Sequence, residues 1–116
     1  MEALYGRAGS VFGWIDLDTG RIINRTGRHA AFVVGGNAYN WSGRHVGWWH
    51  DNHLRNHSGQ VALFLRGASG LGPAIPALAA TPARPAIAAV PAKPALAATP
   101  AKPARSASWA PTVPFA

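Results

Sequence analysis

The chain has 116 residues, no cysteine and a formal net charge of +7. The lack of cysteine excludes disulfide bonds, thiolate nucleophiles and cysteine-based zinc sites. No apolar run is long enough to cross a membrane, and the opening residues lack the basic and then apolar pattern of a secretory signal. We therefore expect a cytoplasmic protein whose positive charge suits anionic partners.

The prolines divide the chain into two parts. All ten lie at or beyond Pro73, so residues 1–72 are expected to form the folded domain. Residues 73–108 form a low-complexity tail of proline and alanine, and residues 109–116 form a C-terminal end with aromatic side chains. A domain as small as residues 1–72 has a limited core, so another element is expected to stabilise it.

A four-fold repeat organises residues 1–72. Glycines recur with spacings of 18, 16 and 16 residues, at Gly9, Gly27, Gly43 and Gly59. Asparagine precedes three of these glycines by three positions, at Asn24, Asn40 and Asn56. An aromatic residue follows each glycine by five positions, at Trp14, Phe32, Trp48 and Phe64.

Each repeat predicts two short strands and two turns. Asparagine, then threonine or serine, then glycine favours a tight turn, because the asparagine side chain bonds nearby backbone and glycine accepts positive φ. Segments such as 29–34 and 45–50 are rich in aromatic or β-branched residues, which is typical of strands. We expect an all-β fold of about eight short strands in a closed or radial meander. The four repeated aromatics would converge as its shared core.

The order of these motifs resembles the bacterial four-fold β-flower family. The resemblance rests on the Y-x-x-x-G-x-x-V-G-W units, the RGASG that follows the last strand, the proline-periodic tail and the late S-x-S-W. It implies four pseudo-symmetric β repeats followed by a proline-rich C-terminal segment, and it carries over no activity and no catalytic residue. The chain departs from the pattern at Gly6, at Leu63 and in its alanine-rich tail.

The tail has a period of its own. Residues 73–108 divide into four nonapeptides, and every third residue from 74 to 107 is alanine. Three residues per turn is the repeat of polyproline II, which would extend the tail to about 110 Å. The prolines exclude an α-helix.

Two interpretations of the tail stay open. It is either a flexible or semi-rigid spacer, or a pre-extended contact strip whose alanine face packs against aromatics or another such strand. The strip would comprise Ala83, Arg84, Ala92, Lys93, Ala101 and Lys102. Trp109 and Phe115 would anchor its far end or pack against their own domain.

Neither metal binding nor catalysis is expected. His50, His53 and His57 have a spacing that would suit a metal on a helix, but the repeat places them on strands and turns. Asp16, Asp18 and Asp51 fall in predicted turns. Because no catalytic or nucleotide-binding motif is present, we expect no enzyme activity and no cofactor.

We therefore predict a non-enzymatic structural or interaction protein. It would belong to a larger protein assembly, dock through its polyproline II tail onto other protein subunits, and could form a homo-oligomer. The alternative is a basic nucleic-acid-binding or nucleoid-associated accessory protein. That alternative rests on candidate phosphate contacts at Arg25, Arg28, Arg44 and Arg55, with Trp41 and Trp49 as stacking faces.

Overall fold

The computed structural model describes residues 1–115, which contain eight strands and no helix. Among these residues, therefore, no helix is long and apolar enough to cross a membrane. The strands are β1 (Glu2–Tyr5), β2 (Val11–Ile15), β3 (Arg21–Asn24), β4 (His29–Val34), β5 (Asn37–Tyr39), β6 (His45–His50), β7 (His53–Arg55) and β8 (Val61–Phe64).

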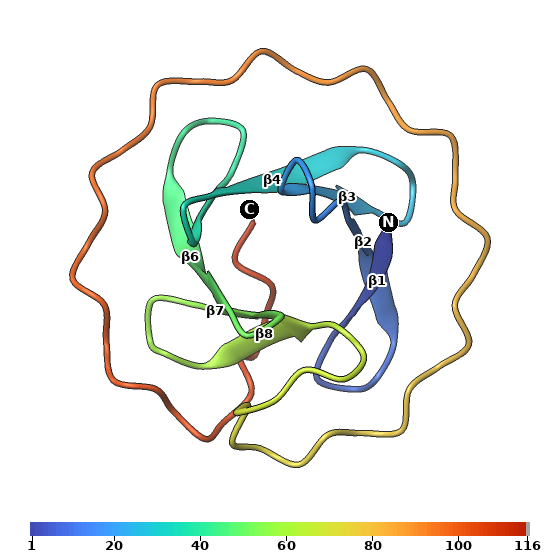
Figure 1. The fold of residues 1–116 in the computed structure, drawn as a ribbon, viewed down its shortest axis with the longest axis vertical. Coiled ribbons are helices and arrows are strands. Elements are labelled where there is room, and N and C mark those ends of the chain that lie inside the picture. Colours follow the sequence, from blue (N-terminus) through green and yellow to red (C-terminus); the bar gives the residue numbers. More distant parts are fainter. Residues whose placement is uncertain (116) are drawn as a thin grey trace.

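The eight strands close into an antiparallel barrel in which each strand pairs with its neighbours in sequence and β8 returns to β1. This confirms the all-β closed meander expected from the repeat. Figure 1 shows four hairpins that splay outwards from a common centre. They are β1–β2, β3–β4, β5–β6 and β7–β8.

The turns within the four hairpins share a glycine at positive φ, and three of them also use an asparagine side chain. The Oδ1 atom of Asn24 accepts hydrogen bonds from the amides of Thr26 at 3.0 Å and Arg28 at 3.1 Å. The amide of Gly27, at a φ of 86°, donates to the carbonyl oxygen of Asn24 at 3.1 Å. Equivalent side-chain bonds to Asn40 and Asn56 shape the third and fourth turns. We call these four turns, residues 6–10, 24–28, 40–44 and 56–60, the glycine turns.

The same irregularity in strand pairing lies beside each glycine turn. The pairing register shifts between Leu4 and Tyr5 in the first hairpin, and equivalent shifts occur between the matching residues of the other three. A β-bulge increases local twist and bends the strand that carries it. Four such shifts at equivalent places bend the four hairpins alike, as a small closed barrel requires.

The barrel interior is aliphatic and not aromatic. Its core cluster is formed by buried residues with small or branched side chains: Leu4, Ile15, Ile22, Ala31, Ala38, Val46, Leu54, Ala62, Leu63, Leu65 and Ala110. Small residues are needed because the strands approach closely. A Cβ at Gly13 would collide with the carbonyl oxygen of Ile23, and one at Gly47 with that of Arg55.

The four repeated aromatics are buried but do not meet in this core. Successive residues of a strand face opposite sides, and Ile15 is in the core cluster, so Trp14 beside it lies on the outer face of the barrel. The structure therefore differs from the shared aromatic core expected above. An eight-stranded barrel has an interior just wide enough for side chains to fill, and here aliphatic side chains fill it. The large rings lie instead on the outer face, over which the tail passes.

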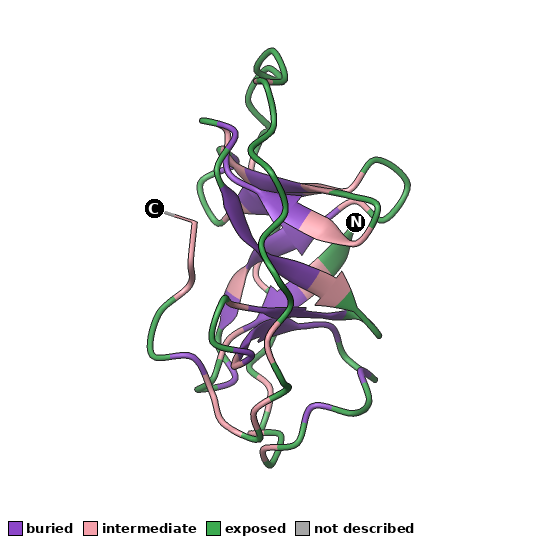
Figure 2. Cartoon of the chain, turned by 90° about the vertical axis from the view of Figure 1, so that its left-hand side faces the viewer, coloured by how far each residue is buried: buried purple, intermediate pink, exposed green. Residues whose placement is uncertain are grey.

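The tail encircles the barrel. Figure 1 shows residues after β8 leaving the domain and passing around all four hairpins, and Figure 2 shows them as a largely exposed band outside the buried strands. The whole chain measures 37 × 37 × 23 Å, so it is a thick disc. Residues 109–115, the C-terminal segment, then turn inwards over the barrel (Figure 1). Trp109 forms a parallel bridge with Val61 at the start of this segment.

Candidate functional site

Four hydrogen bonds attach the tail to the four glycine turns. The amide of Ala79 donates to the carbonyl oxygen of Gly9 at 2.9 Å, and the next three bonds follow at intervals of nine residues. They join Ala88 to Gly27 at 3.0 Å, Ala97 to Gly43 at 2.9 Å and Ser106 to Gly59 at 3.0 Å. One nonapeptide of the tail therefore corresponds to one quarter of the barrel.

The length of the tail matches the circumference that it covers. A disc 37 Å across has a circumference of about 116 Å. Residues 73–108 would span about 110 Å at the polyproline II rise of about 3.1 Å per residue. The match accounts for four nonapeptides, since fewer would not complete the circle.

The tail faces the barrel with its proline column. After residue 72, half-buried residues recur mainly at intervals that are multiples of three. They are Pro73, Pro76, Pro82, Pro85, Pro94, Pro103 and Ser106. The four hydrogen-bond donors occupy the same column and are the positions where proline is replaced by alanine or serine. Proline has no amide hydrogen, so only a non-proline residue can bond a glycine turn there.

The alanine face that the sequence favoured as the contact strip is not the buried one. Ala83, Ala92 and Ala101 are exposed. The alanine column instead contacts the barrel through its backbone at four places. At each place a carbonyl oxygen of the tail lies directly against the glycine of a glycine turn. The carbonyl oxygens are those of Ala77, Ala86, Ala95 and Ala104. A Cβ on any of the four glycines would collide with one of these oxygens, which adds a steric reason for glycine to that of positive φ.

The outer aromatics pack in clusters beneath or beside the tail, and Tyr39 and His45 link the rings of Phe32 and Trp48. The ring of Phe32 lies 4.6 Å from Trp41 and 5.8 Å from Tyr39, and the Nζ atom of Lys93 lies 5.3 Å from its centre. Phe64 lies 5.4 Å from the ring of Trp109. A cation above an aromatic face is attracted by the ring quadrupole, so Lys93 adds to the attachment of the tail.

The remaining two outer aromatics have different neighbours. Trp48 packs against His45 at 4.8 Å and His57 at 5.5 Å between ring centres. Trp14 lines a cavity with Thr81 and Arg84 of the tail. The four repeat positions are thus equivalent in backbone but individual in their contacts.

Arg55 joins the beginning of the tail to its end. This buried guanidinium donates through Nη2 to the carbonyl oxygens of Gly70 at 3.1 Å and Leu71 at 3.0 Å. Through Nη1 it donates to the carbonyl oxygens of Gly59 and Ser106, at 2.6 and 2.8 Å. Burial, with a smaller contribution from the charge of Arg105, lowers the pKa of Arg55. The side chain fastens the circle where its two ends meet.

His53 completes the environment of Arg55. Its Nε2 accepts a hydrogen bond from Nε of Arg55 at 3.1 Å, so the imidazole is neutral with its proton on Nδ1, directed at the carbonyl oxygen of Asp51 at 3.2 Å. Burial lowers the pKa of His53, and the positive charges of Arg55 and Arg105 lower it further. The fastening therefore depends on an uncharged histidine.

Sequence reasoning assigned Arg55 to nucleic-acid contact and missed this role. A signal was present in the repeat. Arg55 lies four residues before its turn glycine, and the equivalent residues of the other repeats are Tyr5, Ile23 and Tyr39. A cation in a column of apolar residues indicates a specific buried partner. The donor positions of the tail had a signal too, since the proline column is interrupted every nine residues.

The histidines considered as metal ligands serve other contacts. His53 bonds Arg55, His57 bonds His45 with 2.9 Å between Nε2 and Nδ1, and His50 lies 3.0 Å from Asp51. Across residues 1–115, no three histidine, aspartate or glutamate side chains are grouped as metal ligands would be.

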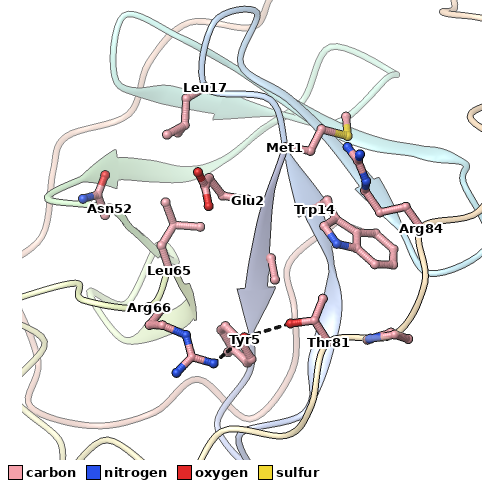
Figure 3. Close-up of a pocket in the computed structure, with 12 residues that line it drawn as sticks. Met1, Glu2, Tyr5, Trp14, Leu17, Asn52, Leu65, Arg66, Thr81 and Arg84 are labelled. Atoms are coloured by element: carbon pink, nitrogen blue, oxygen red, sulfur yellow. Dashed lines mark hydrogen bonds between the residues drawn. The ribbon is translucent and has the colours of Figure 1, made fainter.

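A polar cavity of about 640 Å³ lies where β8 meets β1. These strands share one residue pair, Tyr5 with Phe64, whereas β2 and β3 share three. Figure 3 shows Arg66 and Thr81 converging on the hydroxyl of Tyr5, at 3.2 and 3.3 Å. The bond with Thr81, followed by the bond and charge of Arg66, lowers the pKa of Tyr5. This network ties the weakly paired seam to the tail.

The third column of the tail, here called the outward column, carries several exposed side chains. It carries Ile75, Ile87, Val90 and Leu96, which are 52, 47, 44 and 45% exposed. Arg84, Lys93 and Lys102 alternate with them and are also exposed. The C-terminal residues named from the sequence are half-buried against the domain, Trp109 on Phe64 and Phe115 on Phe12, with ring centres 5.6 Å apart in the latter pair.

The comparisons with known proteins agree with this architecture. One family model, described as 4-fold beta flower protein, matches residues 2–114. The match includes the barrel, the tail and most of the C-terminal segment. No curated protein and no solved structure matches the chain.

Proposed function

Because the chain belongs to the 4-fold beta flower family, we propose that it is a non-enzymatic interaction protein that docks on a protein partner through the outward column of its tail. The observation that carries this proposal is that some side chains of the tail contact the barrel and others are exposed. The proline column, together with Thr81 and Lys93, contacts the barrel. Four large apolar side chains, Ile75, Ile87, Val90 and Leu96, are about half exposed. Apolar residues repeated along one exposed face favour a protein contact.

The charge of the tail defines the partner's surface. The tail contains Arg84, Lys93, Lys102 and Arg105 and no acidic residue. A complementary surface would offer apolar depressions flanked by carboxylates. Because attachment to the barrel already orders the tail, docking would cost little conformational entropy. A partner could contact a long arc of the disc and not only one nonapeptide.

The nucleic-acid alternative has fewer residues to draw on than the sequence suggested. Arg55 is buried, and Trp41 and Trp49 are half-buried. Arg25, Arg28 and Arg44 are exposed on the glycine turns. Nucleic-acid binding would rest mainly on these charges and would therefore weaken steeply with salt.

The test uses the full chain, because deletion of the tail would also expose the outer aromatics. A variant with Ile75→Ser, Ile87→Ser, Val90→Ser and Leu96→Ser is compared with a control carrying Ala83→Ser, Ala92→Ser and Ala101→Ser. Both are used to capture partners from the source cells over a range of salt. We expect the wild type and the control to retain the same protein partner and the first variant to lose it. Recovery of nucleic acid alone, lost at moderate salt, would overturn the proposal in favour of the alternative.

A further inference from the structure

Charge is segregated between the two ends of the barrel. In an antiparallel meander, alternate turns lie at opposite ends, so the four glycine turns share one end. That end carries the exposed Arg7, Arg25, Arg28 and Arg44. All four acidic side chains belong to the other turns or to the start of β1, at Glu2, Asp16, Asp18 and Asp51.

A cavity of about 510 Å³ lies at the basic end, between the first and second glycine turns. Phe12 contributes apolar surface, and the C-terminal segment closes one side with Pro111 and Val113. Arg7 and Arg25 stand at its edge from the two turns. Its size is within the range of small-molecule sites, which are mostly apolar with a few polar groups.

Comparison between repeats shows how this gap differs from the next two, which hold cavities of about 470 and 260 Å³. The residue two positions after the turn glycine faces the residue two positions before the next one. Between the second and third turns these are His29 and Trp41, with ring centres 5.9 Å apart. Between the third and fourth they are His45 and His57, joined by a hydrogen bond of 2.9 Å.

The matching pair in the first gap is Val11 and Arg25, and both line the cavity. This pair makes neither an aromatic contact nor a hydrogen bond, so the side chain of Arg25 is not held by its neighbour across the gap. Among the described residues, the guanidinium groups of Arg7 and Arg25 make no hydrogen bond or ion pair with the protein, and no acidic side chain lines the cavity. An apolar cavity is thus bordered by two uncompensated cations.

We propose that this cavity binds a small amphipathic anion, a carboxylate or phosphate group on an apolar body. The apolar body would occupy the surface formed by Phe12, Pro111 and Val113, and the anionic group would bind Arg7 and Arg25. A guanidinium recognises both anions through paired hydrogen bonds, and the lack of a nearby carboxylate leaves that attraction unopposed. The ligand is taken up as a free monomer, because the C-terminal segment borders the cavity and would keep a flat membrane surface away from it.

The first experiment is isothermal titration calorimetry of the full-length protein with octanoate and octyl phosphate below their micelle concentrations. We expect saturable one-to-one binding of both. Acetate and inorganic phosphate lack the apolar body, and 1-octanol lacks the charge, so each should bind at least about tenfold more weakly. Equal affinity for 1-octanol and octanoate would overturn the proposal. So would binding to anionic phosphatidylglycerol vesicles without binding to the monomeric ligands.

Two variants test the assignment of residues. Arg25→Gln removes one charged donor and should weaken binding of octanoate about tenfold. Arg25→Trp removes the cation and places an apolar ring at this turn, so it should weaken binding of octanoate at least as much as Arg25→Gln. Arg28→Gln, in the same turn but outside the cavity lining, is the control and should leave the affinity unchanged. An equal loss with Arg28→Gln would show a diffuse charge effect and overturn the site.

The outward column of the tail takes no part in this cavity. Failure of the anion site would therefore leave the proposed docking function standing, and the serine variants of the tail would leave ligand binding intact. The two proposals are tested by different residues and different measurements.

Discussion

The backbone amide of Ala88 donates to the carbonyl oxygen of Gly27 across 3.0 Å, and this bond occurs four times around the barrel. It joins residues 61 positions apart in the sequence. Because it recurs every nine residues along the tail, it holds the tail in a circle around the barrel. Its loss at one position tests the attachment of the tail without changing any side chain of the barrel.

Ala88→Pro should lower the free energy of unfolding by about 1–2 kcal/mol, because the donor is lost and the carbonyl oxygen of Gly27 loses its partner. Ala89→Pro is the matched control, since its amide makes no hydrogen bond to the described residues. The control should be neutral or more stable by up to about 1 kcal/mol, because proline restricts the unfolded chain. Urea denaturation measures both, and equal effects would contradict the role of the Ala88 amide.

Gly27→Ala tests the close approach of tail and turn. A Cβ at this position would collide with the carbonyl oxygen of Ala86. Gly35→Ala is the control, since Gly35 also has a positive φ, of 57°, but has nothing within 4 Å of the added Cβ. The control should lose about 1 kcal/mol to the backbone conformation alone. Gly27→Ala should lose at least about 1 kcal/mol more, as thermal denaturation would show. A smaller loss than in the control would mean that the tail is not held against this turn.

Arg55→Met should destabilise the protein by at least about 3 kcal/mol, because several buried carbonyl oxygens lose a charged donor together. Arg44→Met changes an exposed arginine and should stay within about 0.5 kcal/mol of the wild type. Limited proteolysis gives a second measurement. The tail of Arg55→Met should be cut faster than that of the control, and equal cutting would argue against Arg55 as the fastening.

Stability should fall as the pH drops below about 6.5. Burial lowers the folded-state pKa of His45 and of His53. The unfolded state, with a histidine pKa of about 6.5, then binds protons more readily, so acidification favours unfolding. Each histidine contributes a slope of up to about 1.4 kcal/mol per pH unit in the window between its two pKa values. Above about pH 7 the contribution is complete and stability should be level.

The measurement is urea denaturation between about pH 5 and pH 8, the range in which histidine side chains change charge. The variant His45→Gln with His53→Gln should show a flatter pH dependence than the wild type, whatever its stability at neutral pH. A variant as steep as the wild type in this window would assign the effect to other groups.

The features predicted from the sequence are those encoded locally. The repeated Asn-x-Thr/Ser-Gly segments determine turn chemistry within five residues, and short aromatic and β-branched segments determine the strands between them. The family and the closed all-β meander, both confirmed, follow from this repetition. The polyproline II conformation of the tail stays a prediction.

The functions of individual side chains were harder to predict. The alternation along β2 shows that Trp14 and Ile15 face opposite sides, but both are apolar, so the pattern does not say which side is the core. The structure places Ile15 inside because the barrel axis is narrow and the tail covers Trp14. Arg55 likewise acquires its role from segments far away in sequence, at Leu71 and Ser106.

The sequence by itself therefore determined four equivalent hairpins, a change of composition near Pro73 and a tail with periods of three and nine. Only the tertiary structure decided that the period of nine matches one quarter of the barrel, and that the proline column faces inwards. The reason is physical: turns and strands depend on neighbouring residues, whereas the fit of the tail depends on the circumference of the closed barrel. That circumference exists only after eight strands have paired.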